Sequence, residues 1–202
     1  MNGDLFSSGL ATDLLLSIPL ISVVLLAVLL TKRSDDLWVN RKLIHLSSAP
    51  AVLAYIHLFN EPYVFSTLSA LCGLFLLVLR RMSEMRWFQS REDVGEVIYC
   101  FSFSAISIVL WETNRCLGGV IMLFMAVGDA VTGIVRSAFT EERGKHVSGT
   151  VAMFAVSSLI GFVYLGPKGV LLALVASLAE LQPWVDDNLM IPVCTLLTAF
   201  LI

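Results

Sequence analysis

Long apolar segments alternate with short polar ones along the whole chain. Bounded by charges and turn residues, they cover residues 12–31, 41–59, 62–79, 94–111, 116–137, 148–165, 168–182 and 188–202. A helix of about 20 apolar residues crosses the hydrocarbon core of a bilayer. The pattern therefore predicts an all-α integral membrane protein, a multispan bundle of about eight transmembrane helices. The last two segments are near or below spanning length, so seven spans is the alternative.

The composition indicates the same class of protein. Of the 202 residues, 57% are hydrophobic and only 14% are charged, whereas soluble domains carry about 25% charged residues. The polar segments are too short for a soluble domain, so we expect one transmembrane domain over residues 1–202. The net charge of −3 is spread over loops and gives no reason to expect nucleic acid as a partner. Nothing in the sequence indicates an oligomeric state.

The basic residues predict how the bundle is oriented in the membrane. Asp4 and Asp13 precede the core of the first apolar segment, and Lys32 and Arg33 follow it. This order is opposite to that of a secretory signal peptide and predicts an uncleaved span with the amino terminus outside. Eleven of the thirteen Lys and Arg residues then fall on one side, which the positive-inside rule makes cytoplasmic: Lys32, Arg33, Arg41, Lys42, Arg80, Arg81, Arg86, Arg91, Arg136, Arg143 and Lys145.

An acid inside the fifth apolar segment is the most informative polar residue. Asp129 follows Gly128 within the segment 116–137. An acid at the centre of a lipid-facing helix costs about 2.5–3.5 kcal/mol on insertion scales. We therefore expect Asp129 to face the protein interior or a watery cavity, beside a partner. A structural pairing, for example with Arg136, is the alternative to a functional role.

Other polar residues lie near the cytoplasmic ends of their segments. Carboxylate and amide oxygens from several segments suit Mg²⁺, namely Glu96, Asp129, Glu180, Asp187 and Asn188. Cations and a helix amino terminus suit phosphate, namely Arg41, Lys42, Lys145, Ser148 and Gly149. Phosphoryl transfer requires this combination of metal ligands and cations. The simpler alternatives are head-group contacts for Arg41 and Lys42, and a helix cap for the 186–188 acids.

Four motifs occur in a fixed order: RKLIH at 41–45, GDAVTG at 128–133, GKHVSGT at 144–150 and AELQPWVDDNLMIP at 179–192. In type and spacing they resemble the polyprenol kinase family, which includes dolichol kinase, phytol kinase and a CTP-dependent diacylglycerol kinase. The resemblance covers about residues 38–200. It implies phosphorylation of a lipid alcohol, most often an isoprenoid alcohol, with CTP as phosphoryl donor and Mg²⁺ as cofactor.

The resemblance also implies roles for individual residues. Asp129 and His45 are expected to be catalytic, with Asp129 as the acceptor of the hydroxyl proton. Phosphate binding is expected of Arg41, Lys42, Gly128, Lys145, Gly149 and Thr150, and metal binding of Asp129, Glu180, Asp187 and Asn188. Ser148 and Glu96 are added to these two groups from their positions in the sequence and not from the resemblance. Many members of the family carry a glutamate where this chain has Ser148, so a metal or base role at that position is not carried over.

Two other functions compete with a lipid-alcohol kinase at the cytoplasmic face. A CTP-dependent cytidylyltransferase that makes a CDP-activated lipid is also a multispan, Mg²⁺-dependent enzyme. Its expected closing signature contains an Asp-Arg pair, which this sequence lacks. A secondary transporter requires polar residues reachable from both sides, whereas the outer loops here hold only Glu61, Glu112, Arg115 and Lys168.

Overall fold

The computed structural model describes residues 2–34, 36–82, 94–139 and 146–202. Helices make up 88% of these described residues, and no strand occurs among them. The elements are α1 (Asn2–Thr31), α2 (Leu37–Ser47), α3 (Ala49–His57), α4 (Pro62–Met82), α5 (Gly95–Val109), α6 (Trp111–Leu123), the π-helical turn η1 (Phe124–Gly128), α7 (Asp129–Ser137), α8 (Val147–Leu165), α9 (Pro167–Leu181) and α10 (Asp187–Leu201).

Each predicted apolar segment corresponds to a helix, with two differences. The segment 41–59 is divided at Ser48 into α2 and α3, because Pro50 stands in the first turn of α3, where its missing N–H costs no helical hydrogen bond. The first helix begins at Asn2, ten residues before the predicted segment 12–31. The segment 116–137 starts where predicted, because the backbone of α6 is non-helical at Asn114, whose side-chain oxygen accepts the N–H of Leu117. From there α6, η1 and α7 run on from one another. Prolines at Pro62 and Pro167 begin two further helices.

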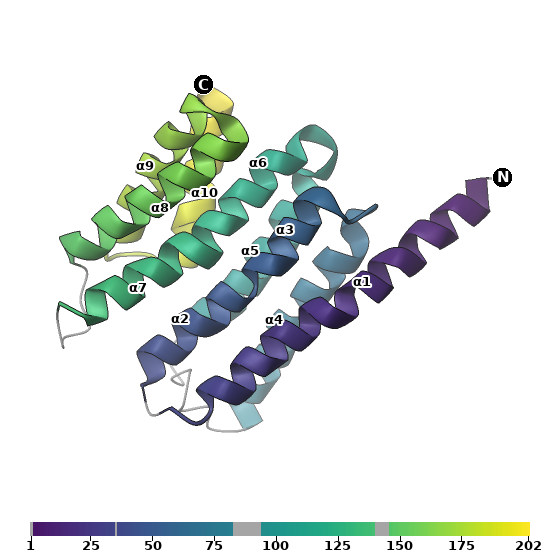
Figure 1. The fold of residues 1–202 in the computed structure, drawn as a ribbon, viewed down its shortest axis with the longest axis horizontal. Helices are drawn as coiled ribbons and strands as arrows, with labels where there is room; N and C mark the ends of the chain where they lie inside the picture. Colours follow the sequence, from purple (N-terminus) through teal and green to yellow (C-terminus); the bar gives the residue numbers. More distant parts are fainter. Residues whose placement is uncertain (1, 35, 83–93, 140–145) are drawn as a thin grey trace.

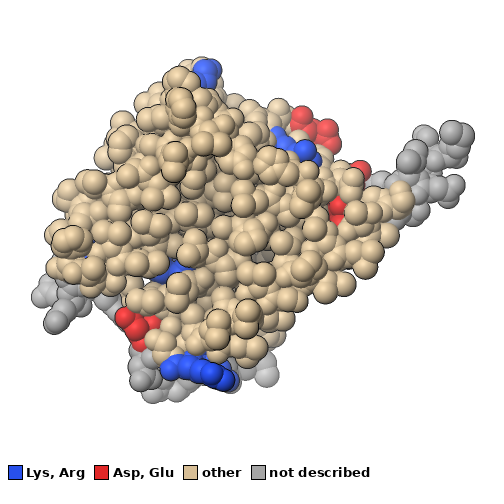
Figure 2. Space-filling view, in the orientation of Figure 1, with Lys and Arg blue, Asp and Glu red and all other residues tan. Residues whose placement is uncertain are grey.

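Four helices in the described part of the chain are long and apolar enough to cross a membrane: Ser8–Thr31, Pro62–Arg80, Trp111–Ser137 and Val147–Leu165. The apolar helices α5 and α10 are shorter, with 15 residues each. Large apolar side chains are exposed along the long helices, as at Leu15, Leu29, Phe75 and Val163. Figure 2 shows the resulting broad uncharged surface, with charged residues toward its margins. This is the architecture of a helical membrane protein.

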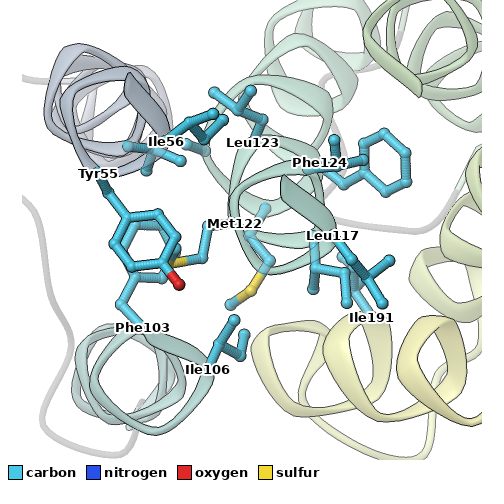
Figure 3. Close-up of a cluster of buried hydrophobic side chains, with 14 of the residues drawn as sticks. Tyr55, Ile56, Phe103, Ile106, Leu117, Met122, Leu123, Phe124 and Ile191 are labelled. Atoms are coloured by element: carbon cyan, nitrogen blue, oxygen red, sulfur yellow. The ribbon is translucent and has the colours of Figure 1, made fainter. Parts of the chain in front are cut away.

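The long helix Trp111–Ser137 is the centre of the bundle. Its apolar window is 78% buried, against 11% for that of α1. Figure 3 shows α6 side chains, including Met122 and Leu123, meeting Tyr55 of α3, Phe103 of α5 and Ile191 of α10. Because α2, α3, α5, α8 and α10 pack around this central helix, Asp129, which follows η1, lies deep inside the protein.

The first helix lies at the edge of the bundle (Figure 1), and a buried acid ties it to the rest. Asp13 is fully buried and accepts hydrogen bonds from the backbone N–H groups of Asn60 and Glu61 and from the Asn60 side chain. Asn60 and Glu61 lie directly before α4, so Asp13 joins α1 to the segment that leads into α4. These hydrogen bonds compensate the burial of its carboxylate, which pairs with no cation among the described residues.

Candidate functional site

A π-helical turn presents Asp129 to the interior. The backbone N–H of Asp129 bonds to the carbonyl of Phe124, five residues back, and single turns of this kind occur frequently at functional sites. A Cβ on the preceding Gly128 would lie 2.5 Å from Ser157 Oγ of α8. Glycine there lets α8 approach the turn closely. The structure therefore assigns Gly128 a packing role beside Asp129.

Asp129 lies between a lysine and a histidine from α2. Lys42 Nζ donates to Asp129 Oδ1 at 2.6 Å, and His45 Nδ1 lies 3.5 Å from Asp129 Oδ2. All three side chains are at most 4% exposed. Their positions follow from the RKLIH spacing, which places Lys42 and His45 three residues apart on one face of α2. The partner expected for Asp129 is therefore Lys42, assisted by His45.

Small and aromatic residues hold Lys42 in place. A Cβ on Gly133 would lie 2.6 Å from Lys42 Cε, so only glycine leaves room for the lysine stem. Trp38 donates its ring N–H to the Gly133 carbonyl at 3.1 Å. The ring of Trp38 lies 5.3 Å from Lys42 Nζ and 4.4 Å from the Arg136 guanidinium, within cation–π range.

Two further carboxylates lie close to that of Asp129. Oxygen atoms of Asp129, Glu180 at the end of α9 and Asp187 at the start of α10 lie within 4.8 Å of one another. Asp129 and Glu180 are each 1% exposed. Arg136 Nη1 lies 3.7 Å from Glu180 Oε1. Three acids this close repel one another strongly unless cations accompany them.

The turn into α10 adds an amide oxygen to this group. Asp186 accepts the N–H of Asn188 and caps the helix, and burial, with Asp187 nearby, raises the pKa of Asp186. Asn188 is buried, and its side-chain N–H donates to the Gly95 carbonyl at 3.2 Å. Asn188 Oδ1 has no hydrogen-bond partner in the described part of the chain. The oxygen-rich donor set of Asp129, Glu180, Asp187 and Asn188 suits a hard divalent cation.

Glu96 and Arg41, the other two predicted residues in this region, pair with each other. Arg41 Nε lies 2.6 Å from Glu96 Oε1, and the Arg41 side chain is 14% exposed. Glu96 is not among the three converging carboxylates. The structure thus separates a buried Lys42–Asp129 pair from a neighbouring Arg41–Glu96 pair.

The amino terminus of α8 lies close to α7. A Cβ on Gly149 would lie 2.8 Å from Thr132 Cγ2, so α7 and α8 touch at this point. The N–H of Ser148 bonds to His146 Nδ1, and the N–H of Gly149 to the His146 carbonyl. Two of the amide groups expected to bind phosphate are therefore engaged. Thr150 Oγ1 is buried without a partner among the described residues, and Lys145 lies outside them.

Tyr99 completes the surroundings of His45. The two rings stack with centroids 4.2 Å apart, and Tyr99 Oη shares a 2.6 Å hydrogen bond with Ser48 Oγ. His45 Nε2 has no hydrogen-bond partner among the residues that the structure describes. A nitrogen buried in this way costs free energy unless a ligand or water binds it.

Sequence reasoning missed three contributors to this site. Trp38, near the start of a predicted span, packs against the two cations Lys42 and Arg136. Gly133 and Tyr99 carried no assigned role. In the sequence, Gly133 is marked only by its place in the GDAVTG motif, one helical turn after Asp129. The absence of a side chain there leaves room for Lys42.

Comparisons with known proteins place few limits on this site. No protein-family model matches the chain, and no solved structure matches it. The chain is similar to an uncharacterized protein of Methanocaldococcus jannaschii, with 31% identity over 110 residues. That alignment covers 52% of this chain and 57% of the relative, so the chain matches little more than half of the length of that protein.

Proposed function

We propose that this protein is a CTP-dependent, or at least nucleoside-triphosphate-dependent, kinase that phosphorylates the hydroxyl of a membrane lipid alcohol, preferably an isoprenoid alcohol. The observation that carries the proposal is the meeting of Asp129, Glu180 and Asp187 beside Lys42 and His45. Acids for a metal, a cation for phosphate and an unpartnered imidazole nitrogen are the parts that phosphoryl transfer uses. The choice of a lipid alcohol as acceptor and of CTP as phosphoryl donor rests on the resemblance of the four motifs to the polyprenol kinase family.

The converging oxygens are the groups that would hold Mg²⁺. A divalent cation held there would supply positive charge to offset the negative charge of the nucleotide phosphates. A carboxylate offers about four lone-pair positions, so Asp129 can keep Lys42 and still serve as a ligand. Lys42 and Arg136 would then balance the charge of the triphosphate. Thr150 Oγ1, at the start of α8, is the hydroxyl best placed in this account to bind phosphate.

His45 is the favoured acceptor of the hydroxyl proton. The sequence alone favoured Asp129 for this step, but Lys42 already donates a hydrogen bond to its Oδ1 atom. His45 Nδ1 faces Asp129 Oδ2, and Nε2 is left to receive a proton. Asp129 would hold the imidazole in the required orientation, as an acid does for a histidine base in many enzymes.

We further propose eight membrane spans, an amino terminus outside and a site on the cytoplasmic face. Ionic and hydrogen-bonding contacts tie the ends of α2, α5, α7 and α9 together at the end of the bundle where the site lies. In the orientation of Figure 1 this end is at the lower left. The positive-inside rule supports its cytoplasmic placement.

Asparagine substitutions at two buried acids test the proposal. We expect Asp129→Asn to lower kinase turnover at least about 100-fold, and His45→Gln to lower it by a factor of about 10²–10⁴. Asp13→Asn, a buried acid of α1, is the matched control and should retain turnover. Folding is checked for each variant by thermal unfolding in detergent. An Asp129→Asn protein that folds and keeps full turnover would refute the assigned site.

A further inference from the structure

An apolar cavity of about 530 Å³ opens beside the candidate site. It lies between α1, α2, α4 and α5, and extends past Ser48 along α3. Its lining is almost entirely aliphatic and aromatic, with residues such as Leu20, Leu68 and Phe75. The cavity is therefore suited to a hydrocarbon, and its volume is within the range of about 300–1,000 Å³ that ligand pockets occupy.

The titratable lining residues His45, Glu96 and Tyr99 lie at the end of the cavity next to Asp129. Glu96 pairs with Arg41, and Tyr99 shares a hydrogen bond with Ser48. His45 Nε2 is buried and has no partner in the described part of the chain. A ligand hydroxyl at this end would satisfy that nitrogen.

Aromatic rings line the opposite end of the cavity. Phe59 and Phe65 lie there with ring centroids 5.9 Å apart, and both are buried. Phe103 lies between the two ends, because its ring centroid is 4.3 Å from that of Tyr99 and 6.3 Å from that of Phe65. Ser17 of α1 lies near Phe59, one helical turn after Asp13. The cavity thus has a polar end, an apolar middle and an aromatic end.

Two estimates of its capacity agree. From Ser17 to Val28 the lining of α1 advances about 16 Å at 1.5 Å per residue. A fully extended peptide advances about 3.5 Å per residue, which contains three backbone bonds, or about 1.2 Å per bond. A hydrocarbon chain that extends by the same amount per bond fits about 14 carbons in line along this length. If each chain carbon takes about 30 Å³, the volume that a water molecule takes in the liquid, the cavity holds about 18 carbons. A lipid with two long acyl tails exceeds this capacity.

We propose that this cavity binds the tail of a single-chain isoprenoid alcohol of about 15 to 20 carbons, with its hydroxyl at His45, and that Ser17, Phe59 and Phe65 limit its length. A polyisoprenoid has four main-chain carbons and one methyl branch per unit, so about 14 carbons in line correspond to three or four units. The assignment of a hydroxyl end rests on the proposed kinase function, whereas tail binding can be measured without it.

Tail binding is tested with a geranylgeraniol analogue that carries a diazirine at the end farthest from the hydroxyl. After irradiation of the purified full-length protein, we expect crosslinks near Ser17 and near Phe59 and Phe65, suppressed by excess geranylgeraniol. Dioleoylglycerol should not suppress them. Crosslinks spread over outward-facing residues such as Leu15 and Leu29 would overturn the cavity assignment.

Length selection is tested with substitutions that fill the cavity. Ser69→Phe should lower crosslinking by geranylgeraniol about tenfold, and Ser17→Phe should shift the preferred acceptor from geranylgeraniol toward farnesol. Thr67→Phe adds the same bulk at an exposed position of α4 outside the cavity, and should change neither quantity more than about twofold. Unchanged binding and length preference in both cavity variants would refute the inference.

The two proposals fail in different ways. Specific crosslinks in the cavity without any phosphorylated alcohol would support the tail site and contradict the kinase proposal. Phosphorylation that proceeds equally well in Ser69→Phe and Ser17→Phe, with crosslinks elsewhere, would support the kinase and contradict the tail site.

Discussion

At the scale of single residues, the candidate site depends on the pairing of Lys42 with Asp129. Both side chains are nearly inaccessible, and their charged atoms lie 2.6 Å apart. A buried ion pair often adds little net stability, but removing one partner leaves a charge in a low-dielectric interior. Here the pair also sets the charge of a site where Glu180 and Asp187 bring further negative charge.

Removing the cation should therefore destabilise the fold, and removing both charges should restore it. We expect Lys42→Met to lower the free energy of unfolding by about 3–5 kcal/mol, and the double variant Lys42→Met with Asp129→Asn to recover most of that loss. Denaturant unfolding in detergent measures both effects. The double variant should stay inactive, because the site requires both residues. A Lys42→Met protein as stable as the wild type would show that the pair is not buried as described.

At the scale of elements, the π-helical turn and the break at Ser48 place the site. The turn η1 sets the direction of Asp129, and the division between α2 and α3 lets the RKLIH face meet it. The first helix depends on fewer contacts, since most of its surface is exposed, and Asp13 is the buried polar anchor that joins it to the segment before α4. The same helix forms one wall of the apolar cavity.

Substitution of Asp13 tests this anchor. Asp13→Ala leaves the buried N–H groups of Asn60 and Glu61 without their acceptor, so we expect a loss of about 1–3 kcal/mol in the free energy of unfolding. Asp13→Asn keeps one acceptor oxygen and should lose less. Thr12→Ala, at an exposed neighbouring position, is the control. If Asp13→Ala unfolds like the control, the anchor does not hold α1 in place.

At the scale of the whole molecule, the charges at the two ends of the bundle predict its orientation. In a cysteine-free background, an impermeant maleimide applied to intact cells should label Lys168→Cys and should not label Ser34→Cys. After permeabilisation both should react. Labelling of Ser34→Cys alone in intact cells would invert the topology and contradict the cytoplasmic site.

Much of this arrangement follows from local sequence signals, and the remainder depends on tertiary contacts. Apolar length and the prolines at 62 and 167 predict the helices, because these signals act within one segment. The acids Asp129, Glu180 and Asp187 were predicted to share a site, and they converge. The pairing of Arg41 with Glu96 was not predicted, since charges of either sign at one membrane face can combine in several ways.

Other residues were misjudged because their sequence signal has two meanings. A tryptophan near the end of a span usually belongs to the membrane interface, but Trp38 lies across Lys42 and Arg136. Basic residues near a span end count toward the positive-inside rule, yet Lys42, Arg41 and Arg136 are largely buried ion-pair partners. The orientation signal is thus weaker than the count of basic residues implies, which makes the maleimide labelling informative.

The proposed kinase activity is tested by supplying the purified protein with Mg²⁺ and with CTP or ATP labelled at the γ-phosphate. Geranylgeraniol, phytol, a short dolichol and diacylglycerol are offered as separate acceptors. We expect label to appear in an isoprenoid alcohol only when Mg²⁺ is present, with CTP as the preferred donor. The Asp129→Asn variant should label no alcohol. Failure to label any alcohol, while phosphatidate and CTP release pyrophosphate, would contradict the kinase proposal and identify a cytidylyltransferase. A folded protein inactive in both assays would contradict it in favour of transport.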